Sequence, residues 1–155
     1  MERIIEEIVK EYNLAPLPEE GGYFRKVLGS PDSVASVIYY LMTEMSFSAL
    51  HKINVHEIWT FISGDPIEQV IIDEDKRVHI SYLGIKGEDS GVKHVASNLW
   101  QGSRLKKGGE RGYALCTTTC IPPYTQEGFI LATHSSITSL VKEKDLAFLS
   151  EFLAP

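Results

Sequence analysis

A succession of short segments rich in β-branched and aromatic residues fills most of the chain. Turn-forming residues separate these segments at 63–66, 73–76, 84–91 and 106–109, and no amphipathic helical pattern lies between them. Closely spaced strands without intervening helices are typical of a sandwich or barrel rather than of a parallel α/β sheet. We therefore predict a mainly β domain with strands over 33–41, 57–62, 67–72, 77–83, 92–96, 113–120 and 128–133.

Helical periodicity appears only at the two ends of the sequence. Residues 2–12 repeat apolar side chains at helical spacing, with charged residues on the opposite side. A turn-rich connector with two prolines and two glycines follows at 14–22. Helical spacing returns over 140–153 through Leu146, Leu149 and Phe152. We expect one domain, 1–155, with a short helix at each end, because no repeat or composition change divides the chain.

The charge balance excludes some classes of partner. The 155 residues contain 15 Lys and Arg against 21 Asp and Glu, a net charge of −6. An acidic chain of ordinary composition disfavours a broad nucleic-acid interface. Its first residues carry charges every few positions, which is unlike a secretory leader or a membrane span. We expect a soluble cytoplasmic domain that binds neither nucleic acid nor membrane.

The two cysteines, Cys116 and Cys120, fall on one face of a predicted strand. Residues at that separation along an extended strand are too far apart for disulfide geometry. No further cysteine is present to complete a zinc site of the usual kind. We expect both thiols to be free and buried.

The segment 51–64 places polar residues where the inward face of a strand should be apolar. Glu57 shares one face with Trp59 and Phe61, and His51 precedes it at matching parity. A buried carboxylate needs a partner, and an imidazole near a carboxylate provides the groups for acid–base catalysis or for a metal site. His56 has the opposite parity, so we expect it to face solvent.

These residues resemble a known family. The spacing His51-x5-Glu57-x6-Gly64 is similar to most of the first cupin motif, Gly-x5-His-x-His-x3-4-Glu-x6-Gly. The chain resembles most closely the small single-domain cupins of type 5, a domain of unknown function. The resemblance runs in order through 20–25, 38–41, His51, 57–59, 64–66, 99–102, 116–117, Pro122 and 129–132.

The chain departs from the metal-binding cupins at two ligand positions. Ile53 stands where the second histidine of the first motif would be, and Gln101 aligns with the histidine of the second motif. Only His51 and Glu57 of the four ligands remain, whereas zinc, iron and manganese sites usually need three protein ligands. We therefore expect no bound metal and no other cofactor, with a divalent ion at His51 and Glu57 as the alternative.

The resemblance implies a double-stranded β-helix, the cupin jelly-roll barrel, with a pocket between its two sheets. It also implies a homodimer, and an open strand edge at 23–28 is a place where two copies could pair. A mixed lining of aromatic and hydrogen-bonding groups suits a small polar or sugar-like ligand, and the alternative is that the tryptophans fill the core. The expected lining is His51, Glu57, Trp59, Trp100 and Gln101, with Tyr40 and Glu68 added by strand parity.

The resemblance leaves several functions open. The fold is similar to that of the dTDP-keto-sugar epimerases, which implies a metal-independent epimerase or isomerase. His51 would then be the base, Glu57 would orient the imidazole, and Tyr40 or Tyr113 would supply the proton. The alternatives are a non-catalytic module that binds or senses a metabolite, and a metal-dependent cupin in which Gln101 or water completes the ligand set. A purely structural partner protein is less favoured, because buried polar residues cost stability that it would not need.

Overall fold

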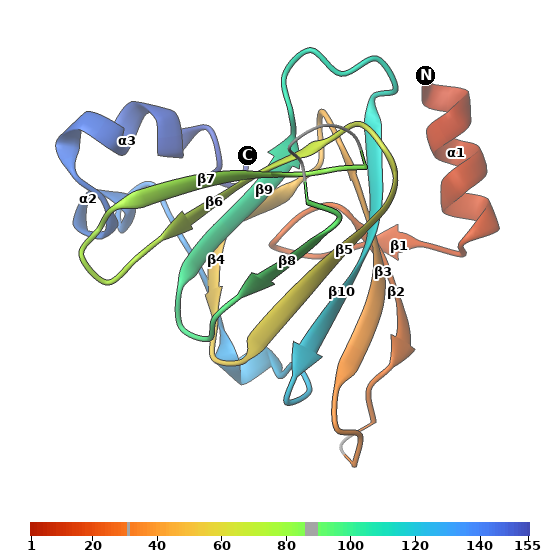
Figure 1. Ribbon diagram of the computed structural model, residues 1–155, viewed down its shortest axis with the longest axis horizontal. Coiled ribbons are helices and arrows are strands. Elements are labelled where there is room, and N and C mark those ends of the chain that lie inside the picture. The colour runs from red at the N-terminus through yellow and green to blue at the C-terminus, as the bar shows by residue number, and fades with distance from the viewer. Residues whose placement is uncertain (31, 86–89) are drawn as a thin grey trace.

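A computed structural model describes residues 1–30, 32–85 and 90–155 (Figure 1). Its elements, in chain order, are α1 (Glu2–Glu11), β1 (Ala15–Pro16), β2 (Tyr23–Leu28), β3 (Ser36–Thr43), β4 (Ser48–Ile53), β5 (His56–Gly64), β6 (Ile67–Ile72), β7 (Val78–Leu83), β8 (Val92–Val95), β9 (Trp100–Leu105), β10 (Tyr113–Ile121), η1 (Gln126–Gly128), β11 (Phe129–Leu131), α2 (Ile137–Leu140) and α3 (Glu143–Ser150). The turn expected at 84–91 falls partly outside the described residues.

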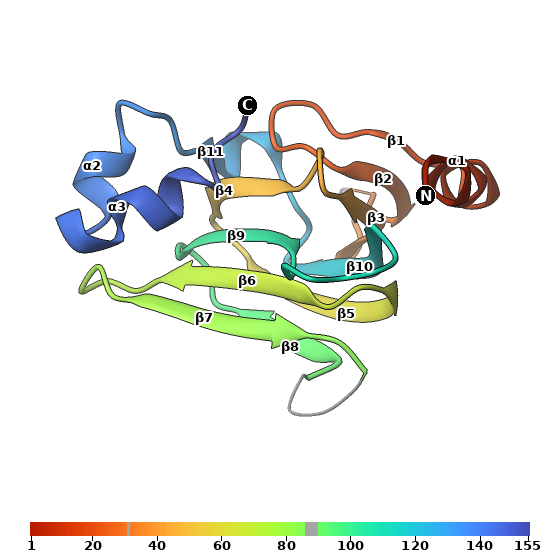
Figure 2. The same cartoon turned by 90° about the horizontal axis from the view of Figure 1, so that it is seen from above.

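The strands form two antiparallel sheets. Sheet A has the order β1-β2-β3-β10-β5-β8, and sheet B has the order β11-β4-β9-β6-β7. From β3 to β6, and again from β8 to β10, consecutive strands alternate between the sheets, so that the chain winds around a common interior (Figure 2). This is the jelly-roll arrangement of the double-stranded β-helix. The predicted fold class is confirmed.

The interior between the sheets is only partly filled by apolar side chains. One buried cluster combines Tyr40, Met42 and Trp59 from sheet A with Ile67 and Leu105 from sheet B. Because successive strand residues point to opposite faces, these same strands also present outward faces that need cover.

The terminal helices provide part of this cover. On sheet A, α1 packs Ile5, Ile8 and Val9 against Leu41 and Leu115. The helices α2 and α3 pack against the outer face of sheet B. They lie on the opposite side of the molecule from α1, as both views show (Figures 1 and 2). None of the described residues of α1, α2 or α3 lines the cavity between the sheets.

Three differences from the predicted elements have local causes. The strands β4 and β9 fall outside the segments that we predicted as strands, whereas β2 occupies the strand edge expected at 23–28. In β4 and β9, polar residues such as His51, Gln101 and Ser103 occupy inward positions, so the expected alternation of apolar and polar residues is lost. The C-terminal helix is interrupted where Val141 and Lys142 adopt extended conformations.

Two other expectations concern the thiols and membrane insertion. Cys116 and Cys120 are free and buried, as predicted. Within the described residues, no helix combines the length and the apolar character needed to cross a membrane.

Candidate functional site

A cavity of about 510 Å³ lies between the sheets, next to the filled part of the core. Its walls come from the connector before β2, from the inner face of sheet A, from β4 and from the segment around β11. The lining residues are Leu17, Pro18, Glu19, Glu20, Phe24, Lys26, Gly29, Ser36, Ile38, Tyr40, His51, Ile53, Glu57, Trp59, Thr118, Cys120, Tyr124, Gln126 and Phe129. The volume of this cavity falls within the range that is usual for small-molecule sites.

His51 is held on β4 in a defined orientation. Its Nδ1 lies 2.7 Å from the carbonyl oxygen of Ala49, and a carbonyl can only accept, so Nδ1 carries the proton. The ring also stacks on Phe129, with 5.3 Å between centroids. In the neutral imidazole this leaves Nε2 with a free lone pair, and no described residue makes a hydrogen bond to Nε2. His51 therefore has the tautomer that a general base or a hydrogen-bond acceptor requires.

A chain of hydrogen bonds connects Trp59, Gln101 and Glu57. The indole Nε1 of Trp59 donates to Oε1 of Gln101 over 3.3 Å, and Nε2 of Gln101 donates to Oε2 of Glu57 over 2.8 Å. Since an indole N–H can only donate, it fixes which end of the Gln101 amide faces the carboxylate. The second carboxylate oxygen, Oε1, has a contact of 4.0 Å with the thiol of Cys120.

Burial controls the protonation of Glu57. The residue is only 7% exposed, and burial is the largest cause that raises the pKa of its carboxyl. Nearby His51 opposes this shift, whereas the neighbouring carboxylate of Glu20 adds to it. The raised pKa means that the charged form of Glu57 is costly at this place.

Tyr40 and Glu20 line the cavity near the connector before β2. The Tyr40 hydroxyl donates to the carbonyl of Gly21 over 2.8 Å, and burial raises the pKa of Tyr40 well above its ordinary value. Glu20 accepts a hydrogen bond of 2.6 Å from Ser48 and lies 3.7 Å from Nδ1 of His51. The carboxylate closest to the histidine nitrogen is thus Glu20, and we find no hydrogen bond between Glu57 and His51 within the described residues.

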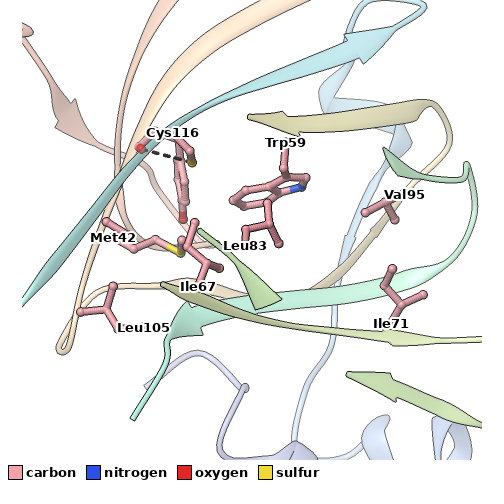
Figure 3. Close-up of a cluster of buried hydrophobic side chains, with 10 residues drawn as sticks. Met42, Trp59, Ile67, Ile71, Leu83, Val95, Leu105 and Cys116 are labelled. Atoms are coloured by element: carbon pink, nitrogen blue, oxygen red, sulfur yellow. Dashed lines mark hydrogen bonds between the residues drawn. The ribbon is translucent and has the colours of Figure 1, made fainter. Parts of the chain in front are cut away.

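Trp59 separates the cavity from the filled core. Its ring packs edge-on against Tyr40, with 5.7 Å between centroids, and it lies beside Leu83 in the apolar cluster (Figure 3). The same residue lines the cavity. Both interpretations of the aromatic residues therefore hold for Trp59: it fills the core on one side and forms a cavity wall on the other.

Three residues that we expected in the pocket lie elsewhere. Glu68 is bound to Arg104 at 2.8 Å, on the outer face of sheet B. Trp100 packs with the cluster beneath the C-terminal helices, and Tyr113 packs in the cluster beneath α1. Strand parity gives the reason: Ile67, Gln101 and Ala114 point inward, so the neighbour of each points outward.

Two expected residues have more specific positions than the sequence indicated. Gln101 does not line the cavity, but it forms hydrogen bonds with Glu57 and Trp59, which do. His56 is exposed, as predicted, and its Nδ1 lies 3.0 Å from Nε2 of His94, because β5 and β8 are neighbours.

Sequence reasoning missed several lining residues. Glu20 belongs to a stretch that matched the family, and its buried partner Ser48 explains its position. Thr118 and Cys120 share strand parity with Cys116, so alternation could have indicated them. Tyr124 comes from the irregular segment between β10 and η1, and no sequence pattern points to it, whereas Phe129 begins β11, within the strand predicted at 128–133.

The donor set does not fit a metal ion. Among the residues that the structure describes, no group of three His, Cys, Asp or Glu side chains is placed to hold one. Ile53 offers no ligand atom, and the Gln101 amide is engaged with Glu57 and Trp59. The metal-binding arrangement associated with this fold is therefore not formed by these side chains.

Comparison with solved structures agrees with the jelly-roll topology. A hypothetical protein from Leishmania major is 25% identical, covers 97% of this chain and 98% of its own, and superposes with a TM-score of 0.84. A protein from Shewanella oneidensis is 20% identical, with 97% of each chain covered and a TM-score of 0.87. Oxalate decarboxylase from Bacillus subtilis is 15% identical with a TM-score of 0.61; the match covers 92% of this chain and 35% of that one, so this similarity concerns the fold alone.

The fold and the position of the cavity define a cupin. The family described as "Cupin superfamily (DUF985)" matches residues 6–132, and the chain belongs to this family. The suspected resemblance is confirmed. No functionally curated protein matches the sequence.

Proposed function

We propose that the protein binds a small polar metabolite in the cavity between its sheets. The observation that carries this proposal is the convergence of His51 and Glu57, both buried, on a cavity that is otherwise largely apolar and aromatic. Buried polar side chains cost stability unless they have partners, and a ligand would provide the partners that the fold leaves out. The same arrangement supports binding without a metal.

A ligand that fits this site should stabilise the folded protein. We expect thermal unfolding in a metabolite library to identify compounds that raise the Tm, by an amount equivalent to about 2.7 kcal/mol at a hundredfold excess over Kd. The variants His51→Gln and Glu57→Gln should lose most of this stabilisation. His79→Gln is the matched control, because His79 is exposed and bonded to Asp73. Equal stabilisation of the wild type and both site variants would refute binding at this site.

Acid–base catalysis is a second candidate, favoured by the tautomer of His51. With Nδ1–H bonded to Ala49, Nε2 can remove a proton from a carbon next to a carbonyl group. Tyr40 keeps its proton and lines the same cavity, so it can return a proton once its bond to Gly21 is exchanged. Such a pair would perform an epimerisation or isomerisation of a sugar-like substrate. If the protein turns over no substrate, the same side chains would serve a protein that only binds or senses a metabolite.

Proton exchange with solvent distinguishes these two candidates. An isomerase incubated with aldoses and ketoses in D₂O should replace the hydrogen next to the carbonyl group, which proton NMR detects. His51→Gln should stop this exchange, whereas His79→Gln should leave it unchanged. Absence of exchange across the sugars would favour a non-catalytic binding protein.

We also propose that the protein forms a homodimer through the edge of β2. In sheet A, β1 pairs with only Tyr23 and Phe24, and no other strand of the described residues pairs with the remainder of this edge. Val27 and Leu28 on the open part are about half exposed. Light scattering at micromolar concentration should give twice the chain mass of 17.4 kDa. A monomer mass would contradict this proposal.

A further inference from the structure

The charges around the cavity have one dominant sign. Glu19, Glu20 and Glu57 contribute carboxylates to its lining, and Lys26 is the only lysine or arginine among the described lining residues. Lys26 is itself exposed, and its ammonium lies 3.4 Å from the carbonyl of Gly29 at the rim. A cavity with this balance attracts cations and repels anions.

The most buried of these carboxylates, Glu57, feels the nearby His51 but forms no salt bridge with any residue that the structure describes. Glu20, by contrast, lies beside His51. The hydrogen bond that Glu57 accepts from Gln101 comes from a neutral amide. A buried charge without a counter-charge costs free energy, and a cation placed beside it would offset that cost.

Aromatic rings complete the lining. Phe24, Tyr40, Trp59, Tyr124 and Phe129 all contribute to the cavity wall. The faces of such rings attract ammonium groups, most strongly where water is excluded. His51 adds a second, independent feature, since it is only 2% exposed and its Nε2 lacks a partner among the described residues. This nitrogen can accept a hydrogen bond from an N–H donor.

We propose that the ligand of this cavity carries a positively charged ammonium group, which Glu57 and Glu20 neutralise while the aromatic rings enclose the rest of the molecule. The inference rests on the proposed function, because it specifies the ligand class of the same cavity. It disfavours anionic ligands such as nucleotide-linked sugars or carboxylic acids, for which the cavity has no cluster of cations among its described residues.

Three probes of one size test this proposal. Benzylammonium, benzyl alcohol and benzoate share a ring and differ in the charge of one group. The chain has two tryptophans, so the indole N–H signals in NMR provide a reporter at the cavity, Trp59, and an internal reference outside it, Trp100. We expect benzylammonium to shift the Trp59 signal at the lowest concentration, with benzoate weaker by at least about tenfold.

Variants identify the responsible carboxylates. Glu57→Gln and Glu20→Gln should each weaken benzylammonium binding by about tenfold and leave benzyl alcohol binding within about twofold. Glu11→Gln makes the same chemical change at an exposed position on α1 and should have no effect. Unchanged binding of benzyl alcohol shows that each variant keeps a folded cavity.

The outcomes separate this inference from the proposed function. If benzoate binds as tightly as benzylammonium, or if neither Glu variant weakens benzylammonium binding, the ammonium proposal is overturned while binding in the cavity stands. If the neutral alcohol is the preferred probe, the ligand is an uncharged molecule and the inference is also overturned. If none of the three probes shifts the Trp59 signal, both the inference and the proposed binding site are rejected.

Discussion

Glu57 is a buried carboxyl group whose ionisation opposes folding. Its side chain is buried, its pKa is raised chiefly by that burial, and its one short hydrogen bond comes from Gln101. In the unfolded chain the same carboxyl ionises at its ordinary pKa. Folding therefore becomes less favourable as the pH rises from the ordinary value through the raised one, because only the unfolded state gains the full benefit of ionisation.

Glu57→Gln should remove this pH-dependent cost. The new amide keeps the shape and can still accept from Nε2 of Gln101. We expect the variant to be more stable than the wild type at pH 8, by on the order of 1 kcal/mol, and the difference to disappear toward pH 4. Denaturant unfolding across this pH range measures the difference. The exposed Glu11→Gln should show no such trend, and a wild type that stays more stable at pH 8 would contradict the argument.

At the scale of the secondary-structure elements, the loop 106–112 between β9 and β10 depends on a single buried side chain. Asp65 lies between β5 and β6, and its carboxylate accepts the backbone N–H groups of Glu110, Arg111 and Gly112 at 2.7–3.1 Å. Gly109 lies so close to Asp65 that an added Cβ would collide with the carboxylate. The loop is thus shaped around an acceptor with two oxygens.

Asp65→Asn should loosen this loop. An amide offers one oxygen and turns an NH₂ group toward backbone donors, so some of them lose their acceptor. We expect a loss of about 1–3 kcal/mol in unfolding free energy. The rate of amide hydrogen exchange should increase more at residues 110–112 than in β10. The exposed Asp75→Asn provides the matched substitution, and equal stabilities of these two variants would refute the role given to Asp65.

Element prediction succeeded where alternation was regular and failed where the site interrupted it. The apolar and aromatic runs of β3, β5, β6 and β10 follow ordinary strand chemistry. In β4 and β9, by contrast, inward polar residues such as His51 and Gln101 hide the pattern.

Parity and family spacing pointed to His51 and Glu57, and both side chains line the cavity. The error for Trp100 came from placing it in the pocket together with its neighbour Gln101, although adjacent strand residues face opposite ways. Tyr124 depends on how the irregular segment between β10 and η1 folds back over the cavity. No local pattern in a single sequence encodes that.

At the scale of the whole molecule, sheet B serves two different environments. Its inner face contributes His51 and Ile53 to the cavity, while its outer face packs against the C-terminal helices. The backbone also joins these parts, because the N–H of Leu50 donates to the carbonyl of Phe152 over 2.7 Å. The C-terminal segment lies beyond residues 6–132, which the family match covers, but it shields the back of the sheet that carries the site.

Phe152→Ala should therefore destabilise the entire fold without changing the cavity lining. The side chain is fully buried, it packs over Gly102, and the Arg104 guanidinium lies 4.4 Å from its ring centroid. Its removal leaves a hole in the outer cluster, and we expect a loss of about 3–5 kcal/mol in unfolding free energy. Met45→Ala, at a position 86% exposed, should cost less than about 0.5 kcal/mol. Denaturant unfolding compares the two variants. Equal losses would mean that the C-terminal cluster is not an integral part of the domain, whereas an unchanged Trp59 indole signal in folded Phe152→Ala would show that the outer cluster acts through global stability alone.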